Sequence, residues 1–236
     1  MIETSVVIPI YNAAGMIEDA IARIVDVMDP LRMNYEILLC DDGSTDGSGE
    51  VLKRIASRYP EARCFYNLSN RGLGATLKRL LNDAQGEKIV YCDCDLPFGA
   101  DAIPVLLKGL EVSDITVASR YRGAVNRTPF TRKVCSRLYY FLCRLLFNIP
   151  VMDIGSGSVA MCRRVAQEIS LKARGFDVHA EFYLKALKMG FAIDEISVES
   201  MITGQGSFCI WVHGPDALVK TFKLYLESLK GALTES

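Results

Sequence analysis

The 236-residue sequence lacks an excess of basic charge, a long apolar run and a paired cysteine motif. Its 27 Lys and Arg are balanced by 28 Asp and Glu. The resulting net charge of −1 argues against nucleic acid as the main partner, because a phosphate polymer calls for a broad basic surface. No stretch reaches the roughly 18 apolar residues that a transmembrane helix needs. The nearest candidate, residues 138–150, includes Arg144.

The eight cysteines do not form a zinc-binding pattern, since only Cys92 and Cys94 are close and their spacing is C-x-C. Several lie in apolar runs, where a reduced thiol behaves as a small hydrophobic side chain. We therefore expect free thiols and a reducing compartment. The first residues lead into a short apolar run that contains Pro9, which does not resemble a signal peptide. A cytoplasmic protein is expected.

In the first 120 residues, short β-branched runs alternate with segments whose apolar residues recur at helical spacing. This alternation predicts βαβ units and an α/β fold, with a mostly parallel central sheet flanked by helices. The predicted strands are 5–11, 35–40, 63–67, 88–92 and 114–118, and the predicted helices are 14–28, 48–59, 72–83 and 101–110.

The second half of the chain is less regular. No repeat or linker separates it from the first, so a single domain, 1–236, is predicted, with halves 1–122 and 123–236. Its predicted elements are helices at 129–147, 180–189 and from 215 to about 230, strands at 158–162 and 191–198, and a loop at 200–212.

In an open parallel sheet, ligands bind beyond the carboxyl ends of the strands, so the residues that follow each strand are candidates for the site. The side chains at these positions include an aromatic ring, carboxylates and a guanidinium group. They are Pro9 and Tyr11 after the first strand, Asp41 and Asp42 after the second, Asp93 and Asp95 after the fourth, and Arg120 after the fifth.

Asp93 and Asp95 are the sharpest feature of the sequence. Residues two apart in an extended segment point the same way, so this pair could hold Mg²⁺ or Mn²⁺. Such a cation neutralises charge on a departing diphosphate. The alternative is a solvated turn with no ligand.

Two other polar segments have competing interpretations. Residues 41–47 (DDGSTDG) fit either a turn whose Asp46 or Ser48 caps the next helix, or carboxylates that bind a base or ribose. Residues 70–74 (NRGLG) resemble a phosphate-binding glycine loop. Their spacing fits neither a dinucleotide fingerprint nor a P-loop, which argues against a dehydrogenase, kinase or ATPase.

Five segments occur in the order and spacing of a known family. They are VVIPIYN (6–12), DDGSTDGS (41–48), NRGLGATL (70–77), DCDLP (93–97) and ASRY (118–121). Together they resemble the inverting glycosyltransferases of family 2, which have the GT-A fold. Segments 128–136, 153–164 and 175–198 are similar to the dolichol-phosphate mannose synthase and polyprenyl-phosphate glycosyltransferase branch.

This resemblance implies a nucleotide-sugar donor bound by residues 1–122 and an acceptor bound by residues 123–236. It implies that Asp95 is the main Mg²⁺ or Mn²⁺ ligand and that Asp93 supports the metal and the sugar or ribose. The residues implied to bind the nucleotide are Pro9, Tyr11, Asp41, Asp42 and Gly72.

The resemblance also implies that Arg120 and Arg132 bind phosphate oxygens with their guanidinium forks, a geometry that Lys cannot copy. Either Arg could instead be a member of an exposed ion pair. The family's closing loop has an Arg and a Lys that residues 203–208 (TGQGSF) lack, and Thr128 stands where the branch usually has Trp.

The acceptor implied by the resemblance is a polyprenyl or dolichyl phosphate. A sugar hydroxyl of a cell-surface glycan is the alternative, and it would need a carboxylate base, for which Asp153 and Glu181 are the candidates. Glu181 could instead complement a helix dipole. His179 is expected at the surface or at a helix cap.

Two further alternatives follow from single features. The altered loop 203–208 fits a non-catalytic sugar-nucleotide-binding subunit. A nucleotidyltransferase would carry an early basic glycine-rich loop, and residues 10–15 contain no Lys or Arg. The basic and aromatic helix predicted at 129–147 either lies on a membrane surface, which would make the protein peripheral, or packs on the sheet.

Overall fold

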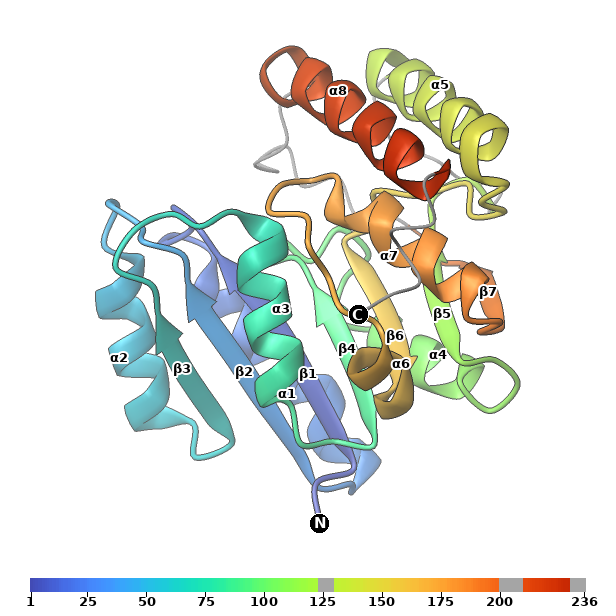
Figure 1. Ribbon diagram of the computed structural model, residues 1–236. Coiled ribbons are helices and arrows are strands. Elements are labelled where there is room, and N and C mark those ends of the chain that lie inside the picture. The colour runs from blue at the N-terminus through green and yellow to red at the C-terminus, as the bar shows by residue number, and fades with distance from the viewer. Residues whose placement is uncertain (123–129, 200–209, 230–236) are drawn as a thin grey trace.

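A computed structural model describes residues 1–122, 130–199 and 210–229 of the chain (Figure 1). Within them, one sheet of seven strands runs through both halves, in the order β3-β2-β1-β4-β6-β5-β7. The strands are β1 Thr4–Ile10, β2 Tyr35–Asp41, β3 Ala62–Tyr66, β4 Lys88–Cys92, β5 Ile115–Ser119, β6 Ser158–Cys162 and β7 Ile193–Ser197.

The sheet is mostly parallel, as predicted. Only β6 is antiparallel to its neighbours, β4 and β5. The register pairs Ile10 with Asp41, so β1 and β2 end side by side. The carboxyl ends of β1, β2, β4 and β5 therefore lie on one edge of the sheet.

Helices cover both faces of the sheet (Figure 1). Val6 and Ile8 pack with α1, α2 and α4 on one face, whereas Val7 and Tyr91 pack on the other with α3, α6 and α7. The helices are α1 Ile17–Met28, α2 Ser48–Arg58, α3 Leu73–Asp83, α4 Ala102–Gly109, α5 Phe130–Phe147, α6 Arg163–Glu168, α7 Val178–Lys188 and α8 Ile210–Leu229, with a 3₁₀ turn η1 at Asp29–Leu31.

Helices α5 and α8 lie side by side on the outer side of α7 (Figure 1). The Tyr139 hydroxyl of α5 lies 2.9 Å from the Thr221 hydroxyl of α8. The rings of Phe147 and Tyr225 meet edge to face, with centroids 6.0 Å apart. Neither these helices nor any other in the described ranges is long and apolar enough to cross a membrane.

The predicted strands and helices agree with the structure to within a few residues, except at three places. The six-residue α6 and η1 were not predicted, because each is too short to show a hydrophobic period. Helix α8 begins at Ile210, five residues before the predicted start, because Gly214 and Pro215 are usually helix breakers. The rest of the predicted loop, 200–209, lies outside the described residues. The proposed boundary at residue 122 remains a prediction.

The seven cysteines in the described ranges are all free, as expected. Four of them, Cys40, Cys92, Cys94 and Cys143, are buried in the apolar layers on either side of the sheet. Burial raises the pKa of the Cys40 thiol to about 11, so this thiol stays protonated at neutral pH.

Candidate active site

The loops that follow β1 and β2 are joined by hydrogen bonds. The Asn12 amide donates to the Ser44 hydroxyl at 2.9 Å, and the Thr45 amide donates to Asn12 Oδ1 at 2.9 Å. The Ala14 amide donates to Asp46 Oδ2 at 2.9 Å. Pro9 is half-buried at the end of β1 and Tyr11 is 46% exposed just beyond it. This network places an exposed aromatic ring at the carboxyl edge.

Asp46 also acts as the helix cap that one interpretation of the DDGSTDG segment predicted. Its Oδ1 accepts hydrogen bonds from the Ser48 amide at 3.0 Å and from the Ser48 hydroxyl at 2.6 Å. Burial alone would raise the pKa of Asp46, but the hydrogen bonds from Ser48 and Ala14 lower it. The segment therefore supplies a cap at Asp46 and, separately, two carboxylates at Asp41 and Asp42.

Those two carboxylates are buried and fix the loops around them. Asp41 Oδ1 accepts the Ser44 amide at 3.0 Å. Asp42 accepts the Asn67 side-chain amide at 2.8 Å, the Arg71 backbone amide at 2.9 Å and the Gly72 amide at 2.8 Å. From the sequence, Asp42 was expected only to bind a base or ribose. Its hydrogen bonds to the glycine loop, residues 70–74, were not predicted.

The glycine loop, residues 70–74, packs closely against residues 173–174. A Cβ on Gly72, whose φ is +89°, would lie 2.2 Å from the Arg174 carbonyl oxygen, and one on Gly74 would lie 2.2 Å from that of Ala173. The Gly74 amide donates to Arg174 O at 2.9 Å. Only glycine permits this approach at Gly72.

Three backbone N–H groups of residues 70–74 are bonded within the chain. Those of Arg71 and Gly72 are bonded to Asp42, and that of Gly74 is bonded to Arg174 O. These three are not left to bind a phosphate. Gly72 faces the 172–174 segment, and its role in nucleotide binding remains a prediction.

After β4 the chain does not continue in extended form, contrary to the expectation for Asp93 and Asp95. The Leu96 amide donates to Asp93 O at 3.0 Å and Leu96 has a φ of +43°, so residues 93–96 form a turn. Both carboxylates are half-buried at the carboxyl edge. The Tyr91 hydroxyl donates to Asp93 Oδ1, and the Asp93 amide donates to Gly157 O at 2.8 Å.

The Asp93 and Asp95 carboxylates fit a divalent cation of the Mg²⁺ type. Such an ion takes oxygen ligands and is commonly held by one or two carboxylates, waters and substrate phosphates. Gly157 leaves room for the Asp93 carboxylate, since a Cβ there would lie 2.3 Å from Oδ2. In the described ranges no three His, Cys, Asp or Glu side chains gather as a metal site. The remaining ligands would have to come from substrate and water.

Arg120 and Asp153 form a buried bidentate ion pair. Arg120 Nε donates to Asp153 Oδ2 at 2.8 Å and Nη2 donates to Oδ1 at 2.7 Å. The side chains are 10% and 0% exposed. The Arg120 guanidinium also lies over the Phe98 ring, 5.7 Å from its centroid. Arg120 is thus a member of an ion pair, but the pair is buried and not exposed. Because both oxygens of Asp153 are bonded to Arg120, its carboxylate is not placed to act as a base.

Glu181 is also turned away from a catalytic role. It is 2% exposed, and its carboxylate accepts the Lys172 amide at 2.9 Å and the Ala173 amide at 2.8 Å. Lys185 Nζ lies 3.0 Å from Oε1. The carboxylate therefore anchors the segment that meets the glycine loop. The other predicted site features, the Arg132 side chain and residues 203–208, lie outside the described residues.

His179 was expected at the surface or at a helix cap, but the structure places it half-buried in the first turn of α7. On α7 it packs against the Tyr91 ring, with centroids 5.9 Å apart. Burial lowers its pKa to about 4, against the opposing effects of Asp153 and Asp177, so the imidazole is neutral at pH 7. The i, i+4 spacing from buried Tyr183 is the signal that could have placed it on the inner face.

The family model described as "Glycosyl transferase family 2" matches residues 5–170. The chain belongs to glycosyltransferase family 2. The matched range contains both carboxylates after β4 and the motifs after β1 and β2. The α/β architecture, with its mostly parallel sheet and flanking helices, is that of the GT-A fold.

Two relatives are similar to this chain over most of its length. The chain is 31% identical over 188 residues to the dolichol-phosphate mannosyltransferase of Pyrococcus furiosus, covering 78% of this chain and 53% of that enzyme. It therefore spans about half the length of that relative. It is 27% identical to the polyprenol monophosphomannose synthase of Mycolicibacterium smegmatis, covering 83% of this chain and 76% of that enzyme.

The fold is shared with glucosyl-3-phosphoglycerate synthase of Mycobacterium tuberculosis, solved with Mn²⁺, uridine diphosphate and phosphoglyceric acid. The TM-score is 0.72 at 22% identity, and the match covers 96% of this chain and 78% of that one. At this identity the likeness shows the fold alone.

The buried position of Glu181 predicts a loss of stability when it is replaced. Glu181→Ala leaves the Lys185 ammonium buried without its carboxylate, which typically costs about 3–5 kcal/mol. Urea unfolding should show a decrease of about that size in the free energy of unfolding. Glu168→Ala, which removes a 51% exposed partner of Arg164, should stay within about 0.5 kcal/mol of the wild type. If Glu181→Ala kept wild-type stability but lost glycosyltransferase activity, Glu181 would again be a candidate for the catalytic base.

The low pKa of His179 predicts a pH-dependent stability. The unfolded histidine takes up its proton near pH 6.5, whereas the folded one does so only near pH 4. Stability is therefore lost as pH falls from 6.5 towards 4, by about 2 kcal/mol at pH 5. In urea unfolding, the free energy of unfolding should be lower at pH 5 than at pH 7. The His179→Asn variant should lack the contribution of His179 to that decrease. An unchanged difference would contradict the assignment.

Proposed function

We propose that this chain transfers a hexose, with inversion, from a GDP- or UDP-sugar to a polyprenyl or dolichyl phosphate, with Mg²⁺ or Mn²⁺ bound. The observation that carries the proposal is the pair Asp93 and Asp95 at the carboxyl end of β4 in a family 2 chain. The names of two relatives, a dolichol-phosphate mannosyltransferase and a polyprenol monophosphomannose synthase, support the acceptor class.

In this proposal the exposed edge binds the donor. Tyr11 and Pro9 border the base, and Asp41 and Asp42 border the ribose while they fix the loops around it. Asp95, supported by Asp93, binds the cation. When bound, the cation neutralises negative charge on the departing diphosphate.

The buried ion pairs favour a phosphate acceptor over a sugar hydroxyl. A hydroxyl would need a carboxylate to take its proton, but Asp153 is paired with Arg120 and Glu181 with Lys185. A phosphate monoester has a second pKa of about 6, so it is already ionised at neutral pH and attacks without a base. The geometry therefore supports the lipid-phosphate alternative.

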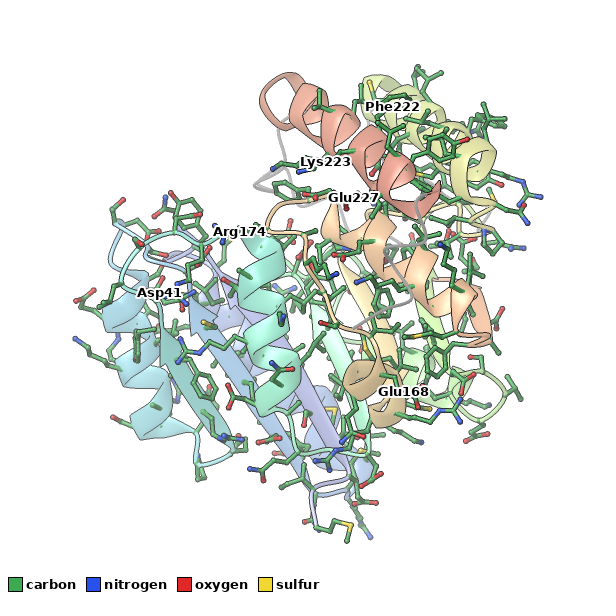
Figure 2. All side chains as sticks on the ribbon, viewed as in Figure 1. Asp41, Glu168, Arg174, Phe222, Lys223 and Glu227 are labelled. Atoms are coloured by element: carbon green, nitrogen blue, oxygen red, sulfur yellow. The ribbon has the colours of Figure 1, made fainter. Side chains whose placement is uncertain are left out.

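Two exposed arginines at the same edge supply positive charge for phosphates. Arg71 and Arg174 flank the contact between Gly72 and the 172–174 segment, and Figure 2 shows Arg174 near the start of α3. We propose that they compensate for the basic residues that the 203–208 segment lacks. Arg132 is the further phosphate-binding candidate that we retain from the family resemblance.

The outer surface of α5 and α8 fits a peripheral position on the cytoplasmic face of a membrane. Helix α5 exposes an apolar stripe at helical spacing, and α8 exposes another, which includes Phe222 (Figure 2). Basic residues such as Arg137 and Arg144 accompany the first stripe and would meet anionic headgroups. The stripes are Val134, Leu138, Phe141 and Leu145 on α5, and Leu218, Val219, Phe222 and Leu226 on α8.

A thermal-shift panel of GDP-, UDP- and dTDP-sugars with and without Mn²⁺ tests the donor site. A true donor at 100 times its Kd stabilises the fold by about 2.7 kcal/mol. We expect the shift to require Mn²⁺ and to be largely lost in Asp95→Ala. Asp26→Ala, at an exposed position on α1, should keep it. An unchanged shift in Asp95→Ala would contradict the metal site.

The same variants test transfer from a radiolabelled donor to a polyprenyl phosphate. Product formation that depends on Mn²⁺ and on Asp95 supports the enzyme. Binding of the donor without transfer to any acceptor would favour the non-catalytic subunit. Transfer to a sugar hydroxyl in place of the lipid would favour the other family 2 alternative.

Co-sedimentation with vesicles that contain phosphatidylglycerol tests the membrane surface. Replacing Phe141 and Leu145, which are 63% and 83% exposed, by Ser removes about 2–3 kcal/mol of apolar burial. The apparent vesicle affinity should fall at least tenfold. Val112→Ser, at an 83% exposed position away from these helices, should leave it unchanged. Equal binding of all three proteins would contradict a membrane role for α5.

A further inference from the structure

Tyr91 is a buried tyrosine whose hydroxyl reaches the candidate metal site. It lies in β4, is 2% exposed, and packs in the same apolar cluster as Val178 and Tyr183 of α7. The His179 ring closes over it at 5.9 Å. A buried tyrosine hydroxyl usually finds a partner within the protein. The role of Tyr91 therefore depends on the group to which its hydroxyl donates a hydrogen bond.

The hydroxyl donates to Asp93 Oδ1. Tyr91 lies near the end of β4, two residues before Asp93, and its hydroxyl reaches the carboxylate in the turn that follows the strand. A tyrosine hydroxyl ordinarily has a pKa of about 10, so it is protonated at neutral pH. The phenol thus keeps its proton and remains the donor.

The other carboxylate oxygen lies close to Gly157. Gly157 precedes β6, and its carbonyl accepts the Asp93 amide at 2.8 Å. A Cβ at Gly157 would lie 2.3 Å from Asp93 Oδ2 and 2.8 Å from Cγ. The carboxylate therefore lies between the Tyr91 hydroxyl and a position that admits only glycine.

We infer that Tyr91 is a positioning residue, which together with Gly157 fixes the Asp93 carboxylate in its metal-binding orientation before a cation arrives. This inference rests on the proposed function, in which Asp93 helps to hold Mg²⁺ or Mn²⁺. A ligand that is already ordered loses less conformational freedom on binding. Groups that orient a metal ligand typically change metal affinity about 10–100-fold when they are removed.

The test compares Tyr→Phe substitutions at two buried tyrosines, each of which removes only the hydroxyl group. Mn²⁺ is titrated into the full chain at saturating nucleoside diphosphate, and free Mn²⁺ is followed by electron paramagnetic resonance. Tyr91→Phe should weaken Mn²⁺ binding about 10–100-fold. Tyr183→Phe is the control, because the Tyr183 hydroxyl is equally buried and has no hydrogen-bond partner among the described residues. The affinity for nucleoside diphosphate without metal should be the same in all three proteins.

The outcomes separate this inference from the proposed function. If the wild type binds Mn²⁺ and Tyr91→Phe binds it equally well, the positioning role is overturned and the metal site stands. If the wild type binds no Mn²⁺, the metal site fails and the inference fails with it. If Tyr91→Phe does not fold, Gly157→Ala replaces it, because the added methyl displaces the carboxylate from the other side. Wild-type Mn²⁺ affinity in Gly157→Ala would also overturn the inference.

Discussion

The contact between residues 70–74 and residues 172–174 is the constraint on which the carboxyl edge depends. It joins the start of α3, in the first half of the chain, to the segment that leads into α7, and a buried carboxylate holds each side of it. Asp42 binds the amides of Arg71 and Gly72, while Glu181 binds those of Lys172 and Ala173. Backbone amides bonded to an ionised carboxylate form strong, charge-assisted hydrogen bonds. The two glycines then allow the backbones to touch.

The same electrostatic rule explains why several acidic residues here are structural. A buried carboxylate is usually paired, and one whose oxygens are occupied by an ion pair and hydrogen bonds is a poor acceptor for a substrate proton. Asp153 and Glu181 are in this state, whereas Asp93 and Asp95 remain half-buried at the edge. The division suits a reaction whose nucleophile arrives already ionised. Burial, more than residue type, separates the ion-paired carboxylates from those that we propose to bind the cation.

The sequence was sufficient for most of the fold. The β-branched strands and the helical spacing of Ile17, Ile21 and Ile24 are local signals, so the elements and the mostly parallel sheet could be predicted. The motifs that follow the strands could likewise be located from the neighbouring sequence. Family membership followed from these motifs and is confirmed by the match over residues 5–170.

The roles of individual side chains were less predictable, because they depend on partners far along the chain. Arg120 and Asp153 are 33 residues apart, and Asp42 and Gly72 are 30 apart. No spacing rule links such pairs. The turn at Leu96 was missed for a different reason, since a positive φ at a leucine has no signal in the sequence. His179 was misplaced because its inner-face position follows from the packing of α7.

The reversed direction of β6 has a consequence for how this edge is assembled. Parallel strands bring their last residues to the edge, but an antiparallel strand brings its first, and so Asp153 and Gly157 arrive there before β6 begins. The stretch between β5 and β6 leaves the sheet at Arg120 and returns at Asp153, where the bidentate pair joins its two ends. Helix α5 belongs to the stretch of chain that this pair closes at its base. The pair therefore keeps Arg120 and Asp153 beside each other at the sheet edge, however many residues the chain places between them.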